Sequence, residues 1–279
     1  MGDDGAGRGF GRLKPAPAVL AAFGVSGPQT QLPGGQGSSW LVGGAVLKPL
    51  DMSEDELAWQ ARVLASMPSI DFRVPRPLRA RDGSLVVEGW CAWEAVVGRH
   101  EAGRWPEVIA VGERFHTALA GFECPDFIAR RTHPWSVGDR VAWGELPAAE
   151  FGDVKHLPRL VAALRPVQAP EQLVHGDLTG NVLFADRLPP AVIDFSPFWR
   201  PTGYAAAIVV ADALAWEGAD ETILDAVAHI EQFEQYLLRA LIFRAVTDRL
   251  FRLDEPPRPD EADEFLPAVE LACRLAESA

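Results

Sequence analysis

Two short apolar runs lie close together in the second half of the chain, Val182-Leu-Phe and Ala191-Val-Ile. Both are rich in β-branched and aromatic residues and are bounded by Gly and Pro, which is typical of paired strands. Asp177 and Asn181 precede the first run, and Asp194 directly follows the second. The pattern therefore predicts a hairpin that carries two carboxylates and an amide at one end.

The first third of the chain contains further short apolar runs separated by glycine turns. Trp40-Leu-Val and Ala45-Val-Leu flank the pair Gly43-Gly44, and a two-glycine turn between apolar runs signals a hairpin. The ranges 73–78 and 84–98 predict additional strand. This part of the chain is therefore expected to be rich in β-structure.

Other segments repeat their apolar residues at helical spacing. One helix is predicted to begin at Ser53, where Ser53 and Glu56 form a capping box. Its apolar face would be made by Leu57, Gln60, Val63, Leu64 and Met67. Further helices are predicted at 15–23, 105–120, 157–164, 203–216, 221–253 and 260–276. The aromatic segment 124–151 is expected to form a loop.

The composition changes after Gly98 from strand-like to helix-like, which predicts a boundary between two lobes. We expect a small β-rich lobe over residues 13–97 and a larger, mainly helical lobe over 98–279. Residues 1–12 are glycine-rich without an apolar period, so they are expected to be a disordered tail.

Charge and cysteine content narrow the class of protein. The formal net charge of -13 argues against a nucleic-acid partner or an anionic membrane, because both favour a basic face. An acidic surface suits either a cationic substrate or solubility alone. The three scattered cysteines predict neither a disulfide framework nor a zinc site, and no run is long enough to span a membrane. A soluble, cytoplasmic protein is expected, and its oligomeric state stays open.

A glycine cluster precedes the predicted Trp40 strand. Because Gly34, Gly35, Gly37 and Ser38 lead into a strand, they match neither the dinucleotide-binding fingerprint nor the P-loop, both of which lead into a helix. Such a loop could lie over phosphates and offer its backbone N–H groups, or it could be an ordinary flexible loop.

Lys48 lies in an apolar strand, in a chain where only three of the 26 basic residues are lysines. It could be a solvated strand lysine, or it could provide a positive charge for the phosphates of a nucleotide, held by a glutamate. Glu56 is the expected partner of Lys48, while Glu54 and Gln60 remain alternatives.

Two polar residues stand in apolar helices. Asp212 is the one acid in the 203–216 helix, so it needs a partner, and it is expected to accept backbone N–H groups from the loop that contains Asp177. His116 is interpreted as a structural histidine rather than a catalytic one.

The order of these motifs resembles a known family. A Gly-rich loop, a strand lysine, a helix acid, a short hinge, then His175-Gly-Asp-x-x-x-Asn and Ile193-Asp-Phe are similar to the aminoglycoside phosphotransferase/choline kinase superfamily. The resemblance covers residues 31–216 and is most specific at 175–195. It implies an α+β, two-lobed protein-kinase-like fold that uses ATP, or another NTP, together with Mg²⁺.

The resemblance also implies roles for individual residues. Asp177 would be the catalytic base that accepts the proton of a substrate hydroxyl. Asn181 and Asp194 would hold Mg²⁺, and His175 and Asp212 would support the loop.

The same resemblance assigns the nucleotide contacts to the first lobe. Lys48 would bind the α- and β-phosphates with Glu56 as its partner. A hinge over residues 94–97 would read adenine through backbone groups, and the loop over the nucleotide would complete the set, which is Gly34, Gly35, Gly37, Ser38, Lys48, Glu56, Glu94, Ala95 and Val96.

The chain departs from the family pattern at one point. Only three residues separate Asp177 from Asn181, whereas the family usually has four, so the loop is one residue short. A tighter turn at Gly180 is the expected remedy, because glycine tolerates backbone angles that other residues avoid.

These observations predict an ATP- and Mg²⁺-dependent kinase acting on a hydroxyl of a small molecule. The chain has nine tryptophans, several of them in predicted loops, and acids such as Glu217, Asp220, Glu231 and Glu234 in the helical lobe. These residues would suit a cationic amino-sugar or amino-alcohol, although they could equally be core and solvated helix faces. A catalytically impaired nucleotide-binding module, a pseudokinase, is the alternative.

Overall fold

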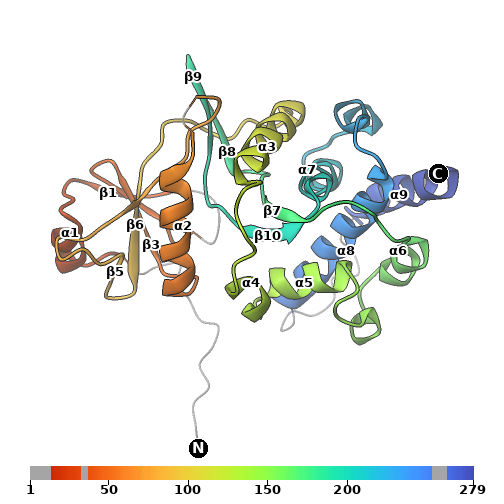
Figure 1. The fold of residues 1–279 in the computed structure, drawn as a ribbon, viewed down its shortest axis with the longest axis horizontal. Coiled ribbons are helices and arrows are strands. Elements are labelled where there is room, and N and C mark those ends of the chain that lie inside the picture. The colour runs from red at the N-terminus through yellow and green to blue at the C-terminus, as the bar shows by residue number, and fades with distance from the viewer. Residues whose placement is uncertain (1–13, 33–36, 69, 253–262) are drawn as a thin grey trace, which may run out of the picture. The chain divides into compact units, whose positions relative to one another are not determined.

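A computed structural model describes residues 14–32, 37–68, 70–252 and 263–279. The chain divides into two compact units, Met1–Gly98 and Arg99–Ala279, and each is described by itself (Figure 1). The expected disordered tail at 1–12 lies outside the described residues.

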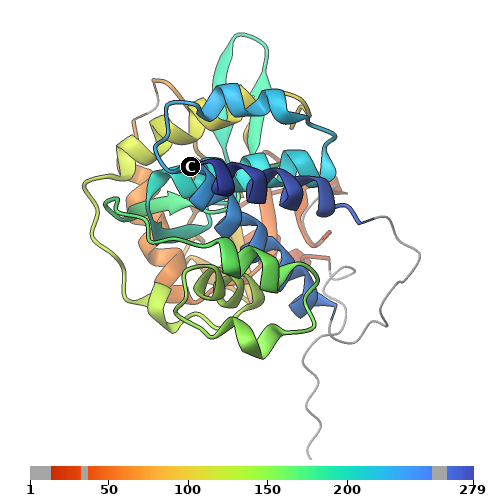
Figure 2. The same cartoon turned by 90° about the vertical axis from the view of Figure 1, so that its right-hand side faces the viewer.

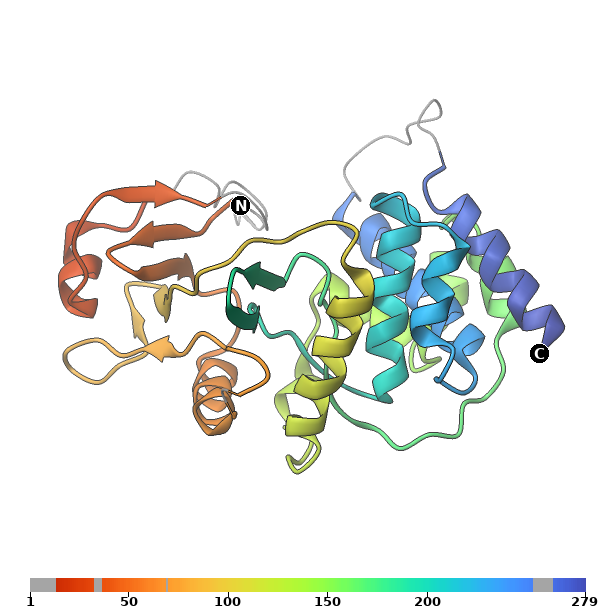
Figure 3. The same ribbon diagram turned by 90° about the horizontal axis from the view of Figure 1, so that it is seen from above.

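The first unit is built on an antiparallel sheet (Figure 3). Its strands follow the order β1-β2-β3-β6-β4, and β5 also pairs with β6. The elements are α1 (Pro17–Phe23), β1 (Gln29–Gln31), β2 (Trp40–Val42), β3 (Ala45–Pro49), α2 (Glu54–Ser66), β4 (Pro77–Leu78), β5 (Val86–Val87) and β6 (Trp90–Glu94). The predicted β2–β3 hairpin is confirmed, and its turn residues Gly43 and Gly44 have φ of +54° and +84°.

Helix α2 begins as the sequence predicts, and one face of it is buried. The Ser53 hydroxyl oxygen accepts a hydrogen bond from the backbone N–H of Glu56 at 3.2 Å. The predicted face is buried throughout: Leu57, Gln60, Val63, Leu64 and Met67.

The strand prediction over 84–98 is only partly right. Glu88 and Gly89 have φ of +49° and +76° and form a tight turn, so that Val87 of β5 pairs with Trp90 of β6. The second predicted range, 73–78, contributes only the two residues of β4.

The second unit is mainly helical (Figure 2). Its central helix α8 packs against four others, α5, α6, α7 and α9. The elements are α3 (Trp105–Leu119), α4 (Phe127–Arg130), α5 (Pro134–Ala142), η2 (Ala148–Phe151), α6 (Leu157–Ala163), β7 (Gln172–His175), β8 (Val182–Ala185), β9 (Leu188–Val192), β10 (Pro197–Arg200), α7 (Thr202–Trp216), η3 (Glu221–Val227), α8 (Phe233–Phe251) and α9 (Leu266–Ser278). Within the described ranges, no helix is long and apolar enough to cross a membrane.

Two predictions of secondary structure in this unit, one of a loop and one of a helix, are wrong. The segment 124–151 is not a loop but contains α4 and α5, and α5 begins where His133 Nδ1 accepts the Ser136 N–H at 3.2 Å. The expected helix over 221–253 is interrupted, because Gln232 has φ of +56° between η3 and α8. The spacing of apolar residues in the sequence gives no indication of the left-handed backbone at Gln232.

Two small antiparallel ladders position the polar residues of the second unit. The predicted hairpin is confirmed as β8 and β9, with Val182 opposite Val192. Strand β10, which the sequence did not predict, pairs with β7 so that Pro197 lies opposite His175. The chain packs closely here, since a Cβ on Gly176 would lie 2.2 Å from the Phe198 ring.

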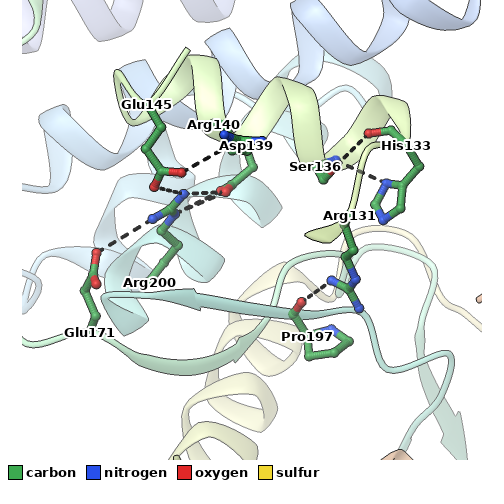
Figure 4. A network of polar contacts seen from close by, with 9 residues as sticks. All are labelled: Arg131, His133, Ser136, Asp139, Arg140, Glu145, Glu171, Pro197 and Arg200. Carbon is green, nitrogen blue, oxygen red and sulfur yellow. Dashed lines mark hydrogen bonds and ion pairs between the residues drawn. The ribbon is translucent and has the colours of Figure 1, made fainter. Parts of the chain in front are cut away.

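A buried arginine joins β10 to α5 (Figure 4). Arg200 Nη2 lies 2.6 Å from Asp139 Oδ2 and 2.7 Å from Glu145 Oε1, and Arg200 Nη1 lies 3.7 Å from Glu171 Oε1. Burial raises the pKa of Asp139 to about 6, although the hydrogen bonds from Arg200 act in the opposite direction. We refer to Arg200 with Asp139, Glu145 and Glu171 as the Arg200 cluster.

Candidate active site

The loop between β7 and β8 places Asn181 beside the end of β9. The Asn181 N–H donates to the Leu178 carbonyl at 3.0 Å, and the Ile193 N–H donates to the Asn181 carbonyl at 2.9 Å. Asp194 follows Ile193 directly. Asn181 and Asp194 therefore flank the open end of the β8–β9 hairpin, as the sequence predicts, and Asp177 lies in the same loop as Asn181.

His175 fastens this loop to the segment before Asp194. Its Nδ1 accepts the Asp177 N–H at 3.1 Å, and its Nε2 donates to the Ile193 carbonyl at 3.0 Å. Because an N–H can only donate and a carbonyl can only accept, Nδ1 carries no proton and Nε2 carries one, so the ring is neutral. Burial lowers the pKa of His175, which favours this neutral form. His175 thus contacts both sides of the hairpin opening through its ring.

His116 of α3 contacts the backbone of His175. Its Nε2 accepts the backbone N–H of His175 at 3.0 Å. Burial, with the neighbouring His175, lowers the pKa of His116 to about 3. A neutral histidine that satisfies a buried N–H agrees with the structural interpretation of this residue.

The loop from Asp177 to Asn181 is one residue shorter than the family pattern, and a tight turn at Gly180 compensates for this. Gly180 has φ of +78°, in the left-handed region that glycine adopts readily. The Asn181 Nδ2 then donates to the Asp177 carbonyl at 2.8 Å and lies 3.3 Å from Asp177 Oδ2. The predicted tighter turn at Gly180 is confirmed, and it brings the two side chains into contact.

The donor set at this end of the hairpin fits a hard cation. Asn181 Oδ1 accepts no hydrogen bond from the described residues, and Asp194 has φ of +50°, which is uncommon outside glycine and is often found at functional positions. No group of three or more His, Cys, Asp or Glu residues suited to a metal occurs among the residues described. One carboxylate with one amide oxygen suits Mg²⁺, which retains water and phosphate oxygens as its other ligands.

Arg244 of α8 is a site residue that the sequence analysis missed. Its Nη2 donates to Asp177 Oδ1 at 2.7 Å and to Asp212 Oδ2 at 2.6 Å, and its Nε donates to Asp212 Oδ1 at 2.7 Å. Although burial opposes it, the two carboxylates raise the pKa of Arg244. We refer to Arg244 with Asp177 and Asp212 as the Arg244 cluster.

The expected role of Asp212 is corrected by this contact. Its hydrogen bonds go to the Arg244 guanidinium and not to backbone N–H groups of the loop. Burial raises the pKa of Asp212, and Arg244 opposes that effect. The sequence did contain a signal for this pair. Asp212 is a lone acid in an apolar helix and needs compensation when buried, and Arg244 lies in the apolar stretch of α8.

The predicted nucleotide loop is described only in part. Gly34 and Gly35 lie outside the described residues. Gly37 has φ of +65°, and its carbonyl accepts from Gln31 Nε2 at 2.5 Å. Ser38 follows it, just before β2.

Lys48 and Glu56 are both placed in the first unit. Lys48 lies on β3 with its side chain 12% exposed, and its Nζ is 3.4 Å from Asp51 Oδ2. Glu56 is buried on α2 and accepts from Gln60 Nε2 at 3.3 Å. The structure thus identifies Asp51 as a partner of Lys48 that the sequence analysis did not name.

The predicted hinge follows β6. The N–H of Glu94 donates to the Arg76 carbonyl, and the N–H of Ala95 donates to the Gly44 carbonyl, each at 2.9 Å. These two N–H groups are therefore used within the first unit. The Val97 carbonyl also accepts a hydrogen bond, from Arg73 Nη2 at 2.8 Å. Among the described residues, the N–H of Val96 and the carbonyl oxygens of Ala95 and Val96 are the hinge groups left to contact a ligand.

Comparison with known proteins gives the fold. The structure is similar to an aminoglycoside phosphotransferase from Alicyclobacillus acidocaldarius (13% identity, 96% of this chain and 97% of that chain, TM-score 0.58). It is also similar to the choline kinase LicA from Streptococcus pneumoniae (11% identity, 94% and 97%, TM-score 0.56). A ternary complex of aminoglycoside phosphotransferase APH(4)-Ia with ADP and hygromycin B is a further match (16% identity, 94% and 97%, TM-score 0.55).

These likenesses confirm the predicted fold class, an α+β protein-kinase-like fold with a small β-rich part and a larger helical part. A search of curated protein sequences gave no match. The model of the phosphotransferase enzyme family (APH) matches residues 29–198, which is more than half of the chain and includes the loop of Asp177 and Asn181. The chain belongs to the phosphotransferase enzyme family.

Proposed function

We propose that this protein is a kinase that transfers the γ-phosphoryl group of ATP to a hydroxyl of a small molecule. The main support is the arrangement at the open end of the β8–β9 hairpin. Asp177 and Asn181 lie in one loop there, and His175 links that loop to the residue before Asp194. Membership of the phosphotransferase enzyme family supports the same reaction.

Asp177 would act as the base. Its side chain is 36% exposed, so a substrate hydroxyl can reach it. The hydroxyl proton passes to the carboxylate as the oxygen attacks the γ-phosphorus and the bond to the β-phosphate oxygen breaks, releasing ADP. Alignment and cancellation of phosphate charge contribute most of the rate in such transfers.

Asn181 and Asp194 would hold Mg²⁺ through the amide oxygen and the carboxylate. The bound ion supplies positive charge to the phosphate oxygens. Their neighbours support this assignment, since the Asn181 amide is oriented by the Asp177 carbonyl and Asp194 is held in an unusual backbone conformation.

The first unit would bind the nucleotide. Lys48 would contact the α- and β-phosphates with Glu56 as its partner, and the loop residues Gly34, Gly35, Gly37 and Ser38 would cover them. Glu94, Ala95 and Val96 would read adenine, with Val96 and the carbonyl oxygens making the contacts. The complexes of APH(4)-Ia with ADP and of spectinomycin phosphotransferase with ADP and spectinomycin support a nucleotide in this fold.

The acceptor would lie beside Asp177 and Trp216. Trp216 ends α7, is 47% exposed, and lies 6.0 Å from the Arg244 guanidinium, which itself contacts Asp177. An exposed indole suits the apolar face of a sugar or the cation of an amine. An amino-sugar or amino-alcohol acceptor is consistent with hygromycin B and spectinomycin, the compounds bound by the two similar proteins.

Two of the acids proposed for a cationic acceptor are already engaged in other contacts. Glu217 accepts hydrogen bonds from His100 Nε2 at 3.1 Å and from Trp105 Nε1. Asp220 accepts from the Thr222 N–H at 3.0 Å. A cationic acceptor would therefore depend on Trp216 and on Glu231 and Glu234 rather than on these two.

A nucleotide-binding module without turnover is the second candidate. The observation that favours it is the contact of Lys48 Nζ with Asp51 Oδ2 at 3.4 Å, a carboxylate that the sequence analysis did not expect beside this lysine. Such a module would bind ATP with Mg²⁺ but leave every acceptor unchanged.

The test is ADP release with ATP and Mg²⁺ in the presence of amino-sugars, amino-alcohols or neutral sugars. We expect turnover with at least one acceptor, and its loss in Asp177→Ala with nucleotide binding retained in a thermal-shift assay. Binding without turnover for every acceptor would favour the second candidate. Turnover with neutral sugars alone would exclude the cationic acceptor.

A further inference from the structure

The Arg244 cluster contains one carboxylate that needs a buried cation and one that does not. The side chain of Asp212 is 2% exposed, and a buried carboxylate requires compensation. The side chain of Asp177 is 36% exposed and can be solvated by water. Arg244 nevertheless lies as close to Asp177 as to Asp212, at 2.7 Å and 2.6 Å.

The planar guanidinium serves the two acids with different edges. Its Nε and Nη2 donate in parallel to the two oxygens of Asp212, which is the bidentate arrangement that fixes an arginine best. The second hydrogen of Nη2 is then directed to Asp177 Oδ1. Asp212 thus orients Arg244, and Arg244 in turn orients Asp177.

The two oxygens of Asp177 are held differently. Oδ1 accepts the short, charge-assisted hydrogen bond from Arg244 at 2.7 Å. Oδ2 lies 3.3 Å from Asn181 Nδ2, a longer contact with a neutral amide. Oδ2 is therefore the oxygen that an incoming hydroxyl can approach without breaking the stronger contact.

The loop itself offers no alternative cation. Residues 175–181 contain neither lysine nor arginine. In the described part of the chain, the other side chains that hydrogen-bond Asp177 are the neutral ring of His175 and the amide of Asn181. A positive charge at the base therefore comes from α8, far along the chain.

We propose that Arg244 is a positioning residue that fixes the Asp177 carboxylate so that Oδ2 faces the acceptor hydroxyl. This inference rests on the proposed kinase function. Arg244 touches neither acceptor nor nucleotide in this role. Arg244 sets the rotation of the Asp177 carboxylate and balances its charge through Oδ1, the oxygen that does not face the acceptor. Asp212 holds Arg244 in place.

The first test replaces the buried ion pair by neutral groups. Arg244→Met alone would leave Asp212 buried without compensation and could fail to fold, so the informative variant is Arg244→Met combined with Asp212→Asn. We expect kcat to fall about 100-fold with the KM for MgATP unchanged, since misplacement of a catalytic group costs about this much. An unchanged kcat would overturn the proposal.

Chemical rescue separates positioning from general stability. In Arg244→Ala combined with Asp212→Asn, added guanidinium ion can occupy the vacated space and restore the contact with Asp177. We expect kcat to recover severalfold with guanidinium chloride but not with equal sodium chloride. In the same Asp212→Asn background, Arg244→Lys should retain more activity than Arg244→Met. No difference between the two salts would contradict the proposed role.

The matched control is Arg200→Met, because Arg200 is equally buried and also paired with carboxylates. We expect this variant to unfold more easily but to keep the wild-type kcat at a temperature where it is folded. An equal fall in kcat for Arg200→Met would reduce Arg244 to a structural residue.

The test also distinguishes the inference from the proposed function. Wild-type protein that turns over no acceptor, and does not hydrolyse MgATP with water as acceptor, contradicts the kinase function. In that case a double-mutant cycle of Asp177→Asn and Arg244→Met, made in the Asp212→Asn background, still tests the contact by urea unfolding. Non-additive stabilities support the coupling of Asp177 and Arg244, and additive ones overturn it.

Discussion

Arg200 and Arg244 are buried to the same degree in the helical unit, each 8% exposed, yet they meet their carboxylates in different ways. Arg200 joins Asp139 to the more exposed Glu145 and Glu171, and thereby joins α5 to β10. Arg244 joins a fully buried acid of α7 to the half-exposed Asp177 of the candidate site.

The difference shows that burial alone does not reveal what an arginine does. In the Arg200 cluster no partner is a candidate site residue, so loss of Arg200 is expected to lower the stability of the protein. In the Arg244 cluster one partner is the proposed base, so loss of Arg244 is expected to lower kcat. Variants for which stability and kcat are measured separately can test this difference between Arg200 and Arg244.

The largest expected effect is that of Asp177→Asn. A positioned general base contributes about 10²- to 10⁴-fold to the rate, so we expect kcat to fall in this range. Stability should change little, because Arg244 keeps Asp212 as its buried partner. Steady-state ADP release and urea unfolding measure the two quantities. The comparable change in the other cluster, Asp139→Asn, should leave kcat unaltered, and a loss of activity there would erase the distinction between the clusters.

The next effect is on stability and belongs to Arg200→Met. Removing one member of a buried ion pair leaves a carboxylate without its partner, which costs about 3–5 kcal/mol. Asp139 is the residue left behind, with its side chain 6% exposed. Urea denaturation followed by circular dichroism measures the loss. A change below about 1 kcal/mol, typical of exposed pairs, would show that the Arg200 cluster does not hold α5 to β10.

The two regions should also respond to acid in opposite directions. The pKa of His116, beneath the Asp177 loop, is lowered to about 3 in the folded state, so stability is lost as pH falls from about 6.5 towards 3. The pKa of Asp139 is raised to about 6, so its contribution is present at low pH and is lost as pH rises from about 4 through 6. Each group contributes a slope of up to about 1.4 kcal/mol per pH unit.

Single variants expose these opposing slopes. Asp139→Asn should make the free energy of unfolding fall more steeply between pH 6 and pH 4 than in the wild type. His116→Gln, whose side-chain oxygen can still accept the His175 N–H, should make the fall shallower. Urea unfolding at a series of pH values measures both, and parallel curves for all three proteins would contradict the assignment.

The sequence predicted the local half of the site. The β8–β9 hairpin, the loop of Asp177 and Asn181 and the turn at Gly180 follow from apolar runs and glycine chemistry over a few residues. The capped start of α2 followed in the same way from Ser53 and Glu56.

The clusters could not be predicted because their contacts are distant in the chain. Arg244 is 67 residues from Asp177 and 32 from Asp212, and Arg200 is 61 residues from Asp139. Helical period identifies which face is buried but not which polar group on another helix will meet it. Asp212 was recognised as needing a partner, and the wrong partner was assigned for this reason.

The smallest expected effect comes from a pair of glycines, one beside each cluster. Gly180 and Gly144 have φ of +78° and +73°, and a Cβ on either would meet open space. Alanine at each position should therefore cost the same, about 1 kcal/mol, because only the backbone conformation is penalised. Gly180→Ala should also lower kcat, since the turn at Gly180 sets the contact between Asn181 and Asp177. Gly144→Ala, next to Glu145 of the Arg200 cluster, should leave kcat at the wild-type value. Equal losses of stability with unequal losses of kcat would place the functional geometry in the Arg244 cluster, whereas equal kcat values would show that the short loop tolerates a shift of its turn.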